Sequence, residues 1–445
     1  MKIKQWNIIG VGIFCLLLFS SCDSKENKNP SASPEEMNGL VLNEVCSSPN
    51  GGWIELYNST NNDMNFSGLK VLLSDDYYVN KTVYTAPAQT TIAAGTYKIL
   101  SREHNDIDTD IKTNESLEIS LVAANGMILD VFTRDTDIGR NKNHAEGGSY
   151  SRLPNGAGKW FITKTATQNE ENFGITNRNA IWMWSVSAMN APLANLVNNG
   201  IGHILLNEQF FKSYTLEQAK ARIAEAENLG ITVHVWFQCF YTDEKWISPV
   251  DDINQRYDQE LFDDIIKRAE DYVRMGIKGI HFDYIRFGGT APNHNFPEKG
   301  VTAEGAITEF CKQVSEAVRR INKHVILSAA LMAERSGDYY YGQNPETMGQ
   351  YLDILMPMIY RYTETGGDHG ALWAQSMADY FVGRAGKAEV WAGTTTYKYV
   401  GTNIAGLTAE QMVNDCRVFL NSKATGVVLF RFGLGNMGDL THLWD

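Results

Sequence analysis

The sequence predicts a multi-domain protein in which an all-β antiparallel sandwich precedes an α/β barrel of the (β/α)8, or TIM, type. The chain has 445 residues, of which 43% are hydrophobic, and this is enough for more than one core. Short alternating strands fill its first third, whereas apolar strands alternate with amphipathic helices in the remainder. The predicted segments are a targeting sequence at 1–21, a tether at 22–37, the sandwich at 38–173 and the barrel at 178–445.

The first 21 residues have the pattern of a secretory signal peptide. Lys2 and Lys4 give a basic start, and Ile8 to Phe19 form an apolar stretch that is too short to span a bilayer. Leu18 to Cys22 resembles the lipobox of bacterial lipoproteins, which implies cleavage before Cys22 and lipidation of its thiol. We therefore expect a lipid-anchored protein of the cell envelope, at the outer membrane or in the periplasm. An ordinary secretory signal is the alternative, and it also leads out of the cytoplasm.

The charge and the cysteines restrict the partners and cofactors. A net charge of −13 argues against nucleic acid and anionic lipid surfaces as partners and leaves a carbohydrate open. Apart from Cys15 and Cys22, the four remaining cysteines are scattered and their spacing fits no zinc motif. The histidines are dispersed and no H-E-x-x-H motif is present, so we expect no metal and no cofactor.

Residues 38–173 carry short runs that alternate between apolar and polar side chains, with turn signals between them. The runs are 40–45, 53–57, 97–100, 117–121 and 127–132. Such runs, with little helical periodicity, predict an antiparallel sandwich. We expect the acids Glu44, Glu55 and Asp130 to lie on its solvated face.

Several motifs of this segment resemble those of the lamin-tail domain, an immunoglobulin-like module. They are 42–45 (LNEV), 53–58 (WIELYN), 66–69 (FSGL) and 151–156 (SRLPNG), followed by Trp160. The resemblance spans nearly the whole segment. It implies a binding or spacing module and not a catalyst.

Residues 178–445 contain eight apolar, strand-like runs with helical segments between them. The runs are 181–186, 203–206, 231–240, 277–287, 325–331, 352–360, 390–396 and 426–432. Capping boxes at Thr215–Gln218 and Thr408–Gln411 mark the starts of two helices. Eight such repeats fit a closed parallel barrel covered by helices. A doubly wound open sheet is the alternative, but no glycine-rich phosphate loop is present.

The stretch 279–287 is the centre of the predicted chemistry. It places the charged Asp283 in an apolar strand, where a carboxylate is costly to bury unless it is paired or used. Catalytic groups of such barrels lie at the C-terminal ends of the strands, so Asp283 is the first candidate. His281 and Arg286 are expected to stabilise its negative charge. A simple salt bridge between Asp283 and Arg286 is the alternative.

Glycosidic hydrolysis requires two carboxyl groups, of which one is ionised and the other holds a proton. Asp283 is predicted to be the ionised group. Glu334, after strand five, is predicted to be the acid because apolar residues precede it, and Glu208, after strand two, is the competing candidate. Asp353 lies at the start of strand six, at the opposite end of the barrel, and is excluded.

Aromatic and polar side chains near the strand ends suit the binding of sugar rings and hydroxyl groups. The predicted substrate-binding residues are His281, Arg286, Trp184, Trp236, Gln238, Tyr360, Trp391, Tyr397 and Arg431. Of the neighbours Trp182 and Trp184, only one is expected to face the barrel interior.

The barrel segment resembles the glycosyl-hydrolase-like barrels of bacteria. The motif GIHFDYIRF at 279–287 carries the resemblance, with Trp236, Gln343 and the motif MPMIY at 356–360 as further landmarks. Gly288 follows the first motif where that family often has proline, so the loop after strand four is expected to differ in shape. An Asp after strand four and a Glu after strand five also resemble the amylase-like arrangement.

The resemblance and the side chains together predict a glycoside hydrolase that acts on a polysaccharide outside the cytoplasm. A surface glycan-binding lipoprotein without catalysis is the alternative, and a structural adhesin that uses its sandwich domain is a third possibility. The sugar, the linkage and the stereochemical outcome are left open by the sequence.

Overall fold

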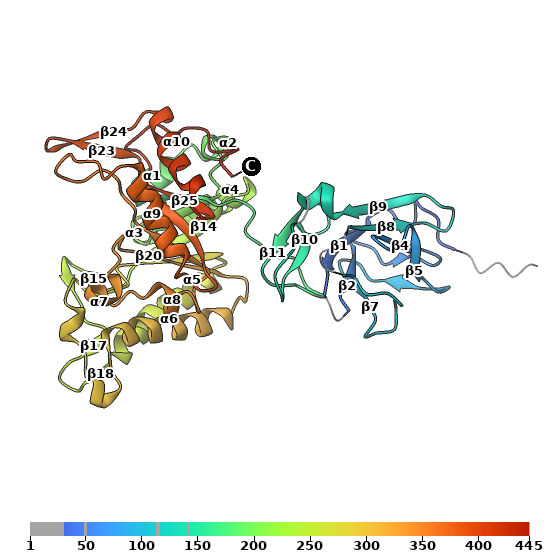
Figure 1. The fold of residues 1–445 in the computed structure, drawn as a ribbon, viewed down its shortest axis with the longest axis horizontal. Coiled ribbons are helices and arrows are strands. Elements are labelled where there is room, and N and C mark those ends of the chain that lie inside the picture. Colours follow the sequence, from blue (N-terminus) through green and yellow to red (C-terminus); the bar gives the residue numbers. More distant parts are fainter. Residues whose placement is uncertain (1–30, 49–50, 113–115, 140–141, 445) are drawn as a thin grey trace, which may run out of the picture. The chain divides into compact units, whose positions relative to one another are not determined.

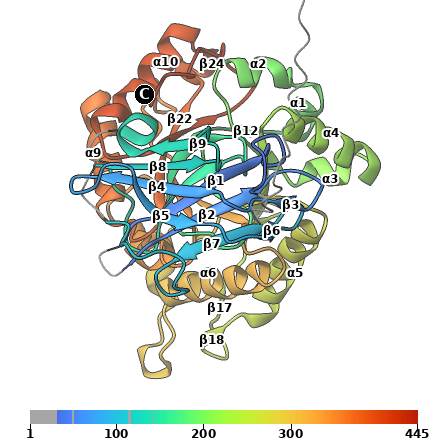
Figure 2. The ribbon, with the colours of Figure 1, turned by 90° about the vertical axis from the view of Figure 1, so that its right-hand side faces the viewer.

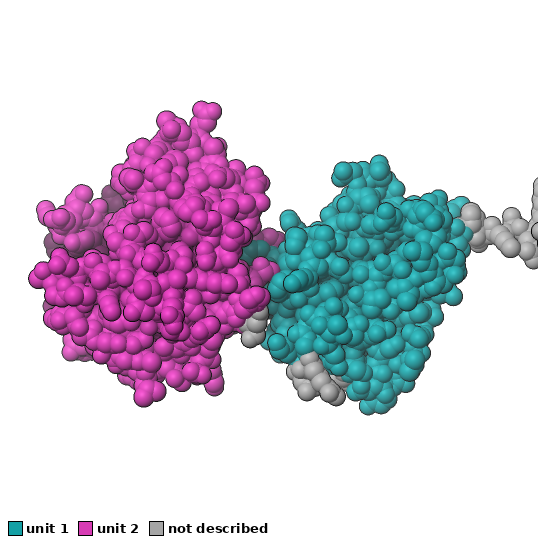
Figure 3. All heavy atoms as spheres, turned by 90° about the horizontal axis from the view of Figure 1, so that it is seen from above, with its two compact units in different colours: residues 1–174 teal, residues 175–445 magenta. Residues whose placement is uncertain are grey.

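The computed structural model describes residues 31–48, 51–112, 116–139 and 142–444. The predicted signal peptide at 1–21 and the lipidation site Cys22 lie outside these residues. The chain divides into two compact units, residues 1–174 and residues 175–445, which Figure 3 colours separately. No helix in the described ranges combines the length and the apolar character that crossing a membrane requires.

The first unit consists of antiparallel sheets around one apolar core, as predicted (Figure 2). One sheet has the order β11-β10-β1-β2-β7 and another has the order β5-β4-β8-β9. The strands of the first sheet are β1 (Leu40–Cys46), β2 (Trp53–Asn58), β7 (Tyr97–Ser101), β10 (Ser149–Leu153) and β11 (Lys159–Thr163). Those of the second are β4 (Lys70–Asp75), β5 (Lys81–Thr85), β8 (Leu117–Val122) and β9 (Ile128–Thr133). The short strands β3 (Met64–Asn65) and β6 (Thr91–Ile92) pair with each other.

The expectation that Glu44 and Glu55 lie on a solvated face is wrong. Both side chains are fully buried and are partners across β1 and β2. Three hydroxyl groups and one backbone N–H donate to the Glu44 carboxylate. Asn43 and the backbone of Asn169 donate to Glu55, whose pKa burial nevertheless raises to about 8. These acids stay inside because polar donors from the closing segment of the domain satisfy them.

The second unit is a closed barrel of eight parallel strands, so the TIM-barrel prediction is confirmed (Figure 1). In barrel order the strands are β12 (Asn179–Met183), β13 (His203–Asn207), β14 (Thr232–Gln238), β19 (Gly279–Asp283), β20 (Ile326–Leu331), β21 (Ile354–Pro357), β22 (Glu389–Thr395) and β25 (Gly426–Phe430). Strands four and six are shorter than predicted. β19 ends at Asp283 because Tyr284 has a positive φ of 51°, which a continuing strand does not allow.

Helices cover the outside of the barrel and bury their apolar faces against the strands. They are α1 (Ser185–Asn190), α2 (Leu193–Asn198), α3 (Gln209–Ser213), α4 (Leu216–Asn228), α5 (Gln259–Arg274), α6 (Ala303–Arg319), α7 (Gly337–Tyr341), α8 (Pro345–Met348), α9 (Ala371–Val382) and α10 (Ala409–Arg417). Both predicted capping boxes are present, at the starts of α4 and α10. Three hairpins lie in the loops that follow strands: β15 (Tyr241–Thr242) with β16 (Lys245–Trp246), β17 (Val250–Asp251) with β18 (Arg256–Tyr257), and β23 (Tyr397–Val400) with β24 (Asn403–Gly406).

Neutral imidazoles fill part of the barrel interior. The indole N–H of Trp182 donates to His281 Nε2 at 3.1 Å, so Nδ1 carries the proton and donates to Ser328 at 2.9 Å. His203 Nε2 must donate to a backbone carbonyl, and its Nδ1 therefore accepts from His234 at 3.0 Å. Burial lowers the pKa of His203 to about 4 and that of His281 to about 3.

Candidate active site

A cavity of about 300 Å³ opens at the C-terminal ends of the barrel strands, where barrel enzymes place their chemistry. Residues from strands one, three, four, six, seven and eight, and from the loops that follow them, line it. They are Trp184, Trp236, Gln238, Asp283, Tyr284, Arg286, Met358, Tyr360, Tyr362, Glu364, Thr395, Tyr397, Tyr399 and Phe430.

Asp283 is the acid that the end of β19 presents to this cavity. Its Oδ1 accepts a hydrogen bond from the backbone N–H of Tyr284 at 2.7 Å, and its Oδ2 accepts one from the indole N–H of Trp236 at 3.0 Å. The alternative of a salt bridge is not observed, because no ion pair joins Asp283 to Arg286 among the described residues. The strand end and the indole thus hold the carboxyl group in one orientation.

Burial raises the pKa of Asp283, and the two hydrogen bonds and the Arg286 charge only partly oppose this effect. A carboxyl group with a raised pKa keeps its proton toward neutral pH. Burial therefore works against the predicted ionised state of Asp283, and the catalytic role of this carboxyl group stays a prediction.

The structure does not bring either predicted partner to Asp283. Glu208 follows the inward-facing Asn207, so its side chain points outward, where Arg268 of α5 binds both of its carboxylate oxygens at 3.0 and 2.8 Å. Glu334 is exposed and accepts a hydrogen bond from the hydroxyl of Tyr341 at 2.9 Å. Neither side chain lines the cavity.

Glu364 is the second acid among the cavity-lining residues, and the sequence reasoning missed it. It lies in the loop after β21, between Tyr362 and Asp368, which form an isolated bridge. Its carboxylate is exposed and makes no hydrogen bond or ion pair within the described part of the chain. It is close enough to Tyr397 to help raise the pKa of that phenol.

Most of the predicted sugar-binding side chains do line the cavity. Trp184, Trp236, Gln238, Tyr360 and Tyr397 are all among its walls. The rings of the two tryptophans lie 4.9 Å apart, and Arg286 also lines the cavity.

His281 and Trp391 were also predicted to bind the substrate, and this is wrong because both lie inside the barrel below its mouth. His281 is fully buried and neutral, and it bonds to Trp182 and Ser328 instead of facing a ligand. Trp391 is fully buried four residues before Thr395 on β22, and its indole N–H donates to Glu389 at 3.0 Å.

The expectation that only one of Trp182 and Trp184 faces inward is also wrong. Trp182 bonds to a side chain of the barrel interior, and Trp184 lines the cavity. Residues two apart share one face of a strand, so both can point inward at different heights.

Besides Glu364, the sequence reasoning missed six cavity-lining residues. They are Tyr284, Met358, Tyr362, Thr395, Tyr399 and Phe430. All follow or end a barrel strand, and this position was the only signal that the sequence carried for them.

The loop after strand four is shaped by a tryptophan from the loop after strand three. A Cβ on Gly288 would lie 2.6 Å from the ring of Trp246, so glycine allows the close approach. The same ring lies 4.6 Å from the guanidinium of Arg286. This contact is the physical reason for glycine at a position where the resembling family often has proline.

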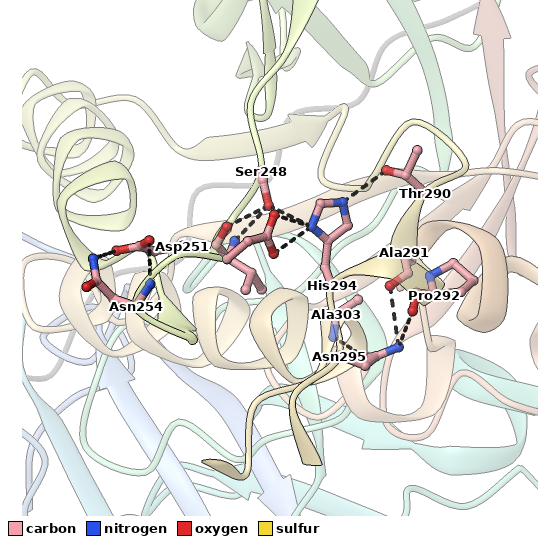
Figure 4. Close-up of polar contacts among 11 residues, drawn as sticks. Ser248, Asp251, Asn254, Thr290, Ala291, Pro292, His294, Asn295 and Ala303 are labelled. Atoms are coloured by element: carbon pink, nitrogen blue, oxygen red, sulfur yellow. Dashed lines mark hydrogen bonds and ion pairs between the residues drawn. The ribbon is translucent and has the colours of Figure 1, made fainter. Parts of the chain in front are cut away.

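A polar cluster also ties these two loops together (Figure 4). His294 Nδ1 lies 2.9 Å from both carboxylate oxygens of Asp252 and 3.4 Å from the hydroxyl of Ser248, and Nε2 lies 3.2 Å from the hydroxyl of Thr290. In a serine-type triad the serine and the acid bond to different ring nitrogens. Here Ser248 and Asp252 both meet Nδ1, so Ser248 is not arranged as the nucleophile of such a triad, and the contacts tie the two loops together.

No group of three or more His, Cys, Asp and Glu side chains in the described ranges is arranged to hold a metal ion.

Two family models match the chain. Residues 33–136 match the Lamin Tail Domain, and residues 211–367 match the family described as "Putative glycosyl hydrolase domain". The chain thus carries a lamin-tail domain followed by a barrel similar to glycosyl hydrolases, and these two parts of the sequence-based resemblance are confirmed. No curated protein matches the chain in sequence.

Among solved structures, the chain is similar to two spore cortex-lytic enzymes called SleL. For the Bacillus cereus enzyme the TM-score is 0.44 at 12% identity, over 64% of this chain and 78% of that chain. For the Bacillus megaterium enzyme it is 0.43 at 11% identity, over 62% and 74%. A GH18 chitinase from Cycas revoluta, solved with (GlcNAc)4, gives 0.42 at 9% identity, over 57% and 94%.

Proposed function

We propose that the barrel hydrolyses glycosidic bonds of a polysaccharide outside the cytoplasm. The observation that carries this proposal is Asp283, a carboxyl group of raised pKa in an aromatic-lined cavity at the catalytic end of a TIM barrel. The match of residues 211–367 to a glycosyl hydrolase family model supports the same reaction class.

In the proposed reaction Asp283 is the general acid. It donates its proton to the glycosidic oxygen while the bond from that oxygen to the anomeric carbon breaks. Glu364 is the second carboxyl group: it takes a proton from a water molecule, whose oxygen attacks the anomeric carbon. If the two carboxyl groups stand only about 5 Å apart around a bound sugar, Glu364 instead attacks the anomeric carbon and forms a glycosyl ester. Asp283, now a carboxylate, then takes a proton from a water molecule that breaks this ester, so the configuration is retained.

The aromatic walls are assigned to sugar binding. Trp184 and Trp236 offer flat apolar rings, which suit the apolar faces of pyranose rings, and Gln238 and the tyrosine hydroxyls can bond to sugar hydroxyls. Trp236 has a double role, because its N–H also donates to Asp283.

Replacement of Trp236 by phenylalanine is expected to move the alkaline limb of the pH–rate profile to higher pH. The indole N–H favours the ionised carboxylate, so its loss raises the pKa of Asp283 and keeps the acid protonated further into the alkaline range. The measurement is kcat/KM of Trp236→Phe against pH. Trp184→Phe is the control, since Trp184 lines the same cavity without bonding to Asp283. A limb that moves to lower pH in Trp236→Phe would contradict the assigned role.

A non-catalytic glycan-binding lipoprotein is the second candidate function. It is favoured by one observation, namely that Glu364 is exposed on a loop and does not stand buried opposite Asp283. The formation of new reducing ends separates the two functions, because a binding protein retains the glycan without cleaving it.

We also propose that Cys22 anchors the protein to the cell envelope by lipid. Cys22→Ala is expected to release the protein from the membrane fraction of a bacterial host, because the thiol that carries the lipid is lost. Fractionation followed by mass spectrometry of the mature N-terminus measures this. An unmodified N-terminus in the wild-type protein would show an ordinary secretory signal instead.

A further inference from the structure

We propose that the substrate is an anionic polysaccharide and that Arg286 and Arg431 bind its acidic groups on two sides of the scissile bond. The inference rests on the proposed function, since it names the substrate class of the same cavity. The recognised chemistry is a carboxylate or a sulfate ester on the sugar.

Arg286 is partly buried, and no salt bridge joins its guanidinium to an acid in the described ranges, although the nearby charge of Asp283 acts on it. Its guanidinium lies over the rings of Trp246, Tyr284 and Tyr341, at 4.6, 5.3 and 5.4 Å. Its one hydrogen bond, to the carbonyl of Phe287, is long at 3.3 Å, and its Nε is buried with no partner. The three rings fix a planar donor at the cavity wall while most of its N–H groups stay unused.

Arg431 is the corresponding cation on the other side of the mouth. It follows β25, and its guanidinium lies 5.7 Å from the ring of Trp184, which lines the cavity. Burial raises the pKa of Tyr397, another lining residue, and the nearby charge of Arg431 partly opposes this rise. No hydrogen bond or ion pair engages this guanidinium in the part of the chain that the structure describes.

The order of the barrel strands places the two arginines opposite each other. Arg286 follows β19 and Arg431 follows β25, which are the fourth and eighth of eight strands in the closed ring. Asp283 stands on β19 beside Arg286, at the end of the strand. A polymer that crosses the mouth from β19 to β25 therefore meets a guanidinium at each end of this path, with Asp283 beside the first of them.

The net charge of the whole chain does not attract an anionic ligand, so nearby cations must provide that attraction. The net charge is −13, so the protein has no general attraction for polyanions. Salt screens this distant charge beyond about 8 Å, whereas a guanidinium fork in contact with a carboxylate or sulfate acts at hydrogen-bond distance. Recognition of an anion here depends on local cations.

The alternative role of Arg286 is to act on Asp283 alone. Burial raises the pKa of Asp283, and the positive charge of Arg286 partly opposes this rise. Glu334 also contributes to the electrostatic surroundings of Arg286, but it is exposed and bonds to Tyr341. A role through Asp283 alone changes the pH profile and leaves discrimination between charged and neutral glycans untouched. The experiment below separates these two roles.

The experiment measures binding to matched charged and neutral glycans with the full chain that carries Asp283→Asn, so that the probes stay intact. Oligogalacturonates are compared with their methyl esters, and sulfated carrageenan oligosaccharides with their desulfated forms. We expect one charged member to bind about 10- to 100-fold more tightly than its neutral counterpart, as loss of a charged hydrogen bond predicts. The pair that shows the difference identifies carboxylate or sulfate as the anion.

Arginine variants then locate the preference. Arg286→Gln and Arg431→Gln, each added to Asp283→Asn, are expected to reduce the preference for the charged glycan about tenfold or more. Arg286→Lys, which keeps the charge and loses the fork, is expected to be intermediate. Lys398→Gln is the matched control: it removes a cation of the β23–β24 hairpin that acts on Asp415 and is not among the residues that line the cavity.

Equal binding of charged and neutral members of both pairs, or no binding of any charged probe, overturns the inference. A preference that survives in both arginine variants, or that Lys398→Gln reduces equally, overturns the assignment to these side chains. Cleavage of a neutral glycan by the wild-type chain refutes this inference and leaves the proposed function intact. Binding of a charged glycan without cleavage supports this inference and refutes the proposed function.

Discussion

Asp283→Asn is expected to reduce glycosidic cleavage by about 10²- to 10⁴-fold while the barrel stays folded. The amide has the size of the carboxyl group but cannot donate a proton to the leaving oxygen. One of the two donors, Tyr284 N–H or Trp236 N–H, loses its acceptor, so the free energy of unfolding is expected to fall by only about 1 kcal/mol.

The release of reducing ends and the unfolding midpoint of the same variants measure this prediction. Glu364→Gln is expected to lose activity to a comparable extent, because it removes the second carboxylate of the cavity. Glu334→Gln is the control, since this exposed acid after β20 does not line the cavity. If Asp283→Asn cleaves at the wild-type rate, or if Glu334→Gln is equally impaired, the assignment of the acids is wrong.

The barrel is expected to lose several kcal/mol of stability between about pH 6.5 and pH 4. His203 and His281 are neutral when folded, with pKa values of about 4 and about 3, whereas an unfolded histidine titrates near 6.5. Below pH 6.5 the unfolded chain therefore binds protons that the folded barrel does not. Each histidine contributes on the order of 3 to 5 kcal/mol above pH 6.5, and this is lost as the pH falls toward the folded pKa.

Urea unfolding followed at several pH values measures this loss. The tautomer gives a second readout: ¹⁵N spectra of the imidazoles are expected to show His281 with its proton on Nδ1 at every pH above 5, and His281→Asn assigns the signal. A ring of His281 that titrates near pH 6.5, or a stability that stays flat down to pH 4, would contradict the buried neutral imidazoles.

The sequence was sufficient for the architecture because the relevant signals are local. The strand-forming runs and the capping boxes at Thr215 and Thr408 depend on periodicity and short spacing, and the structure contains them all. The location of the candidate site at the C-terminal ends of the strands was predictable for the same reason. Asp283 ends β19 and Trp236 lies two residues before the end of β14, and both line the cavity.

The pairing of side chains across the rim was not predictable, because it depends on strand parity, height and loop shape. Glu208 is one residue past an inward position and therefore faces helix α5. His281 and Trp391 have the inward parity but lie below the mouth. Glu364 reaches the cavity through a loop after β21, and nothing in its sequence position encodes that path.

The buried acids of the sandwich show the same limit. Glu44 alternates with apolar neighbours as a solvated residue would, and only the fold brings the hydroxyl groups that enclose it. A period of two gives the face of a strand but not what covers that face.

The most direct test of the central claim is the incubation of the full chain with anionic and neutral polysaccharides in H₂¹⁸O, followed by mass spectrometry of the products. The proposed hydrolysis predicts shorter oligosaccharides with ¹⁸O at their new reducing ends, which Asp283→Asn does not form. Retention of a glycan with no new reducing ends in any polysaccharide would contradict hydrolysis and establish the barrel as a binding protein.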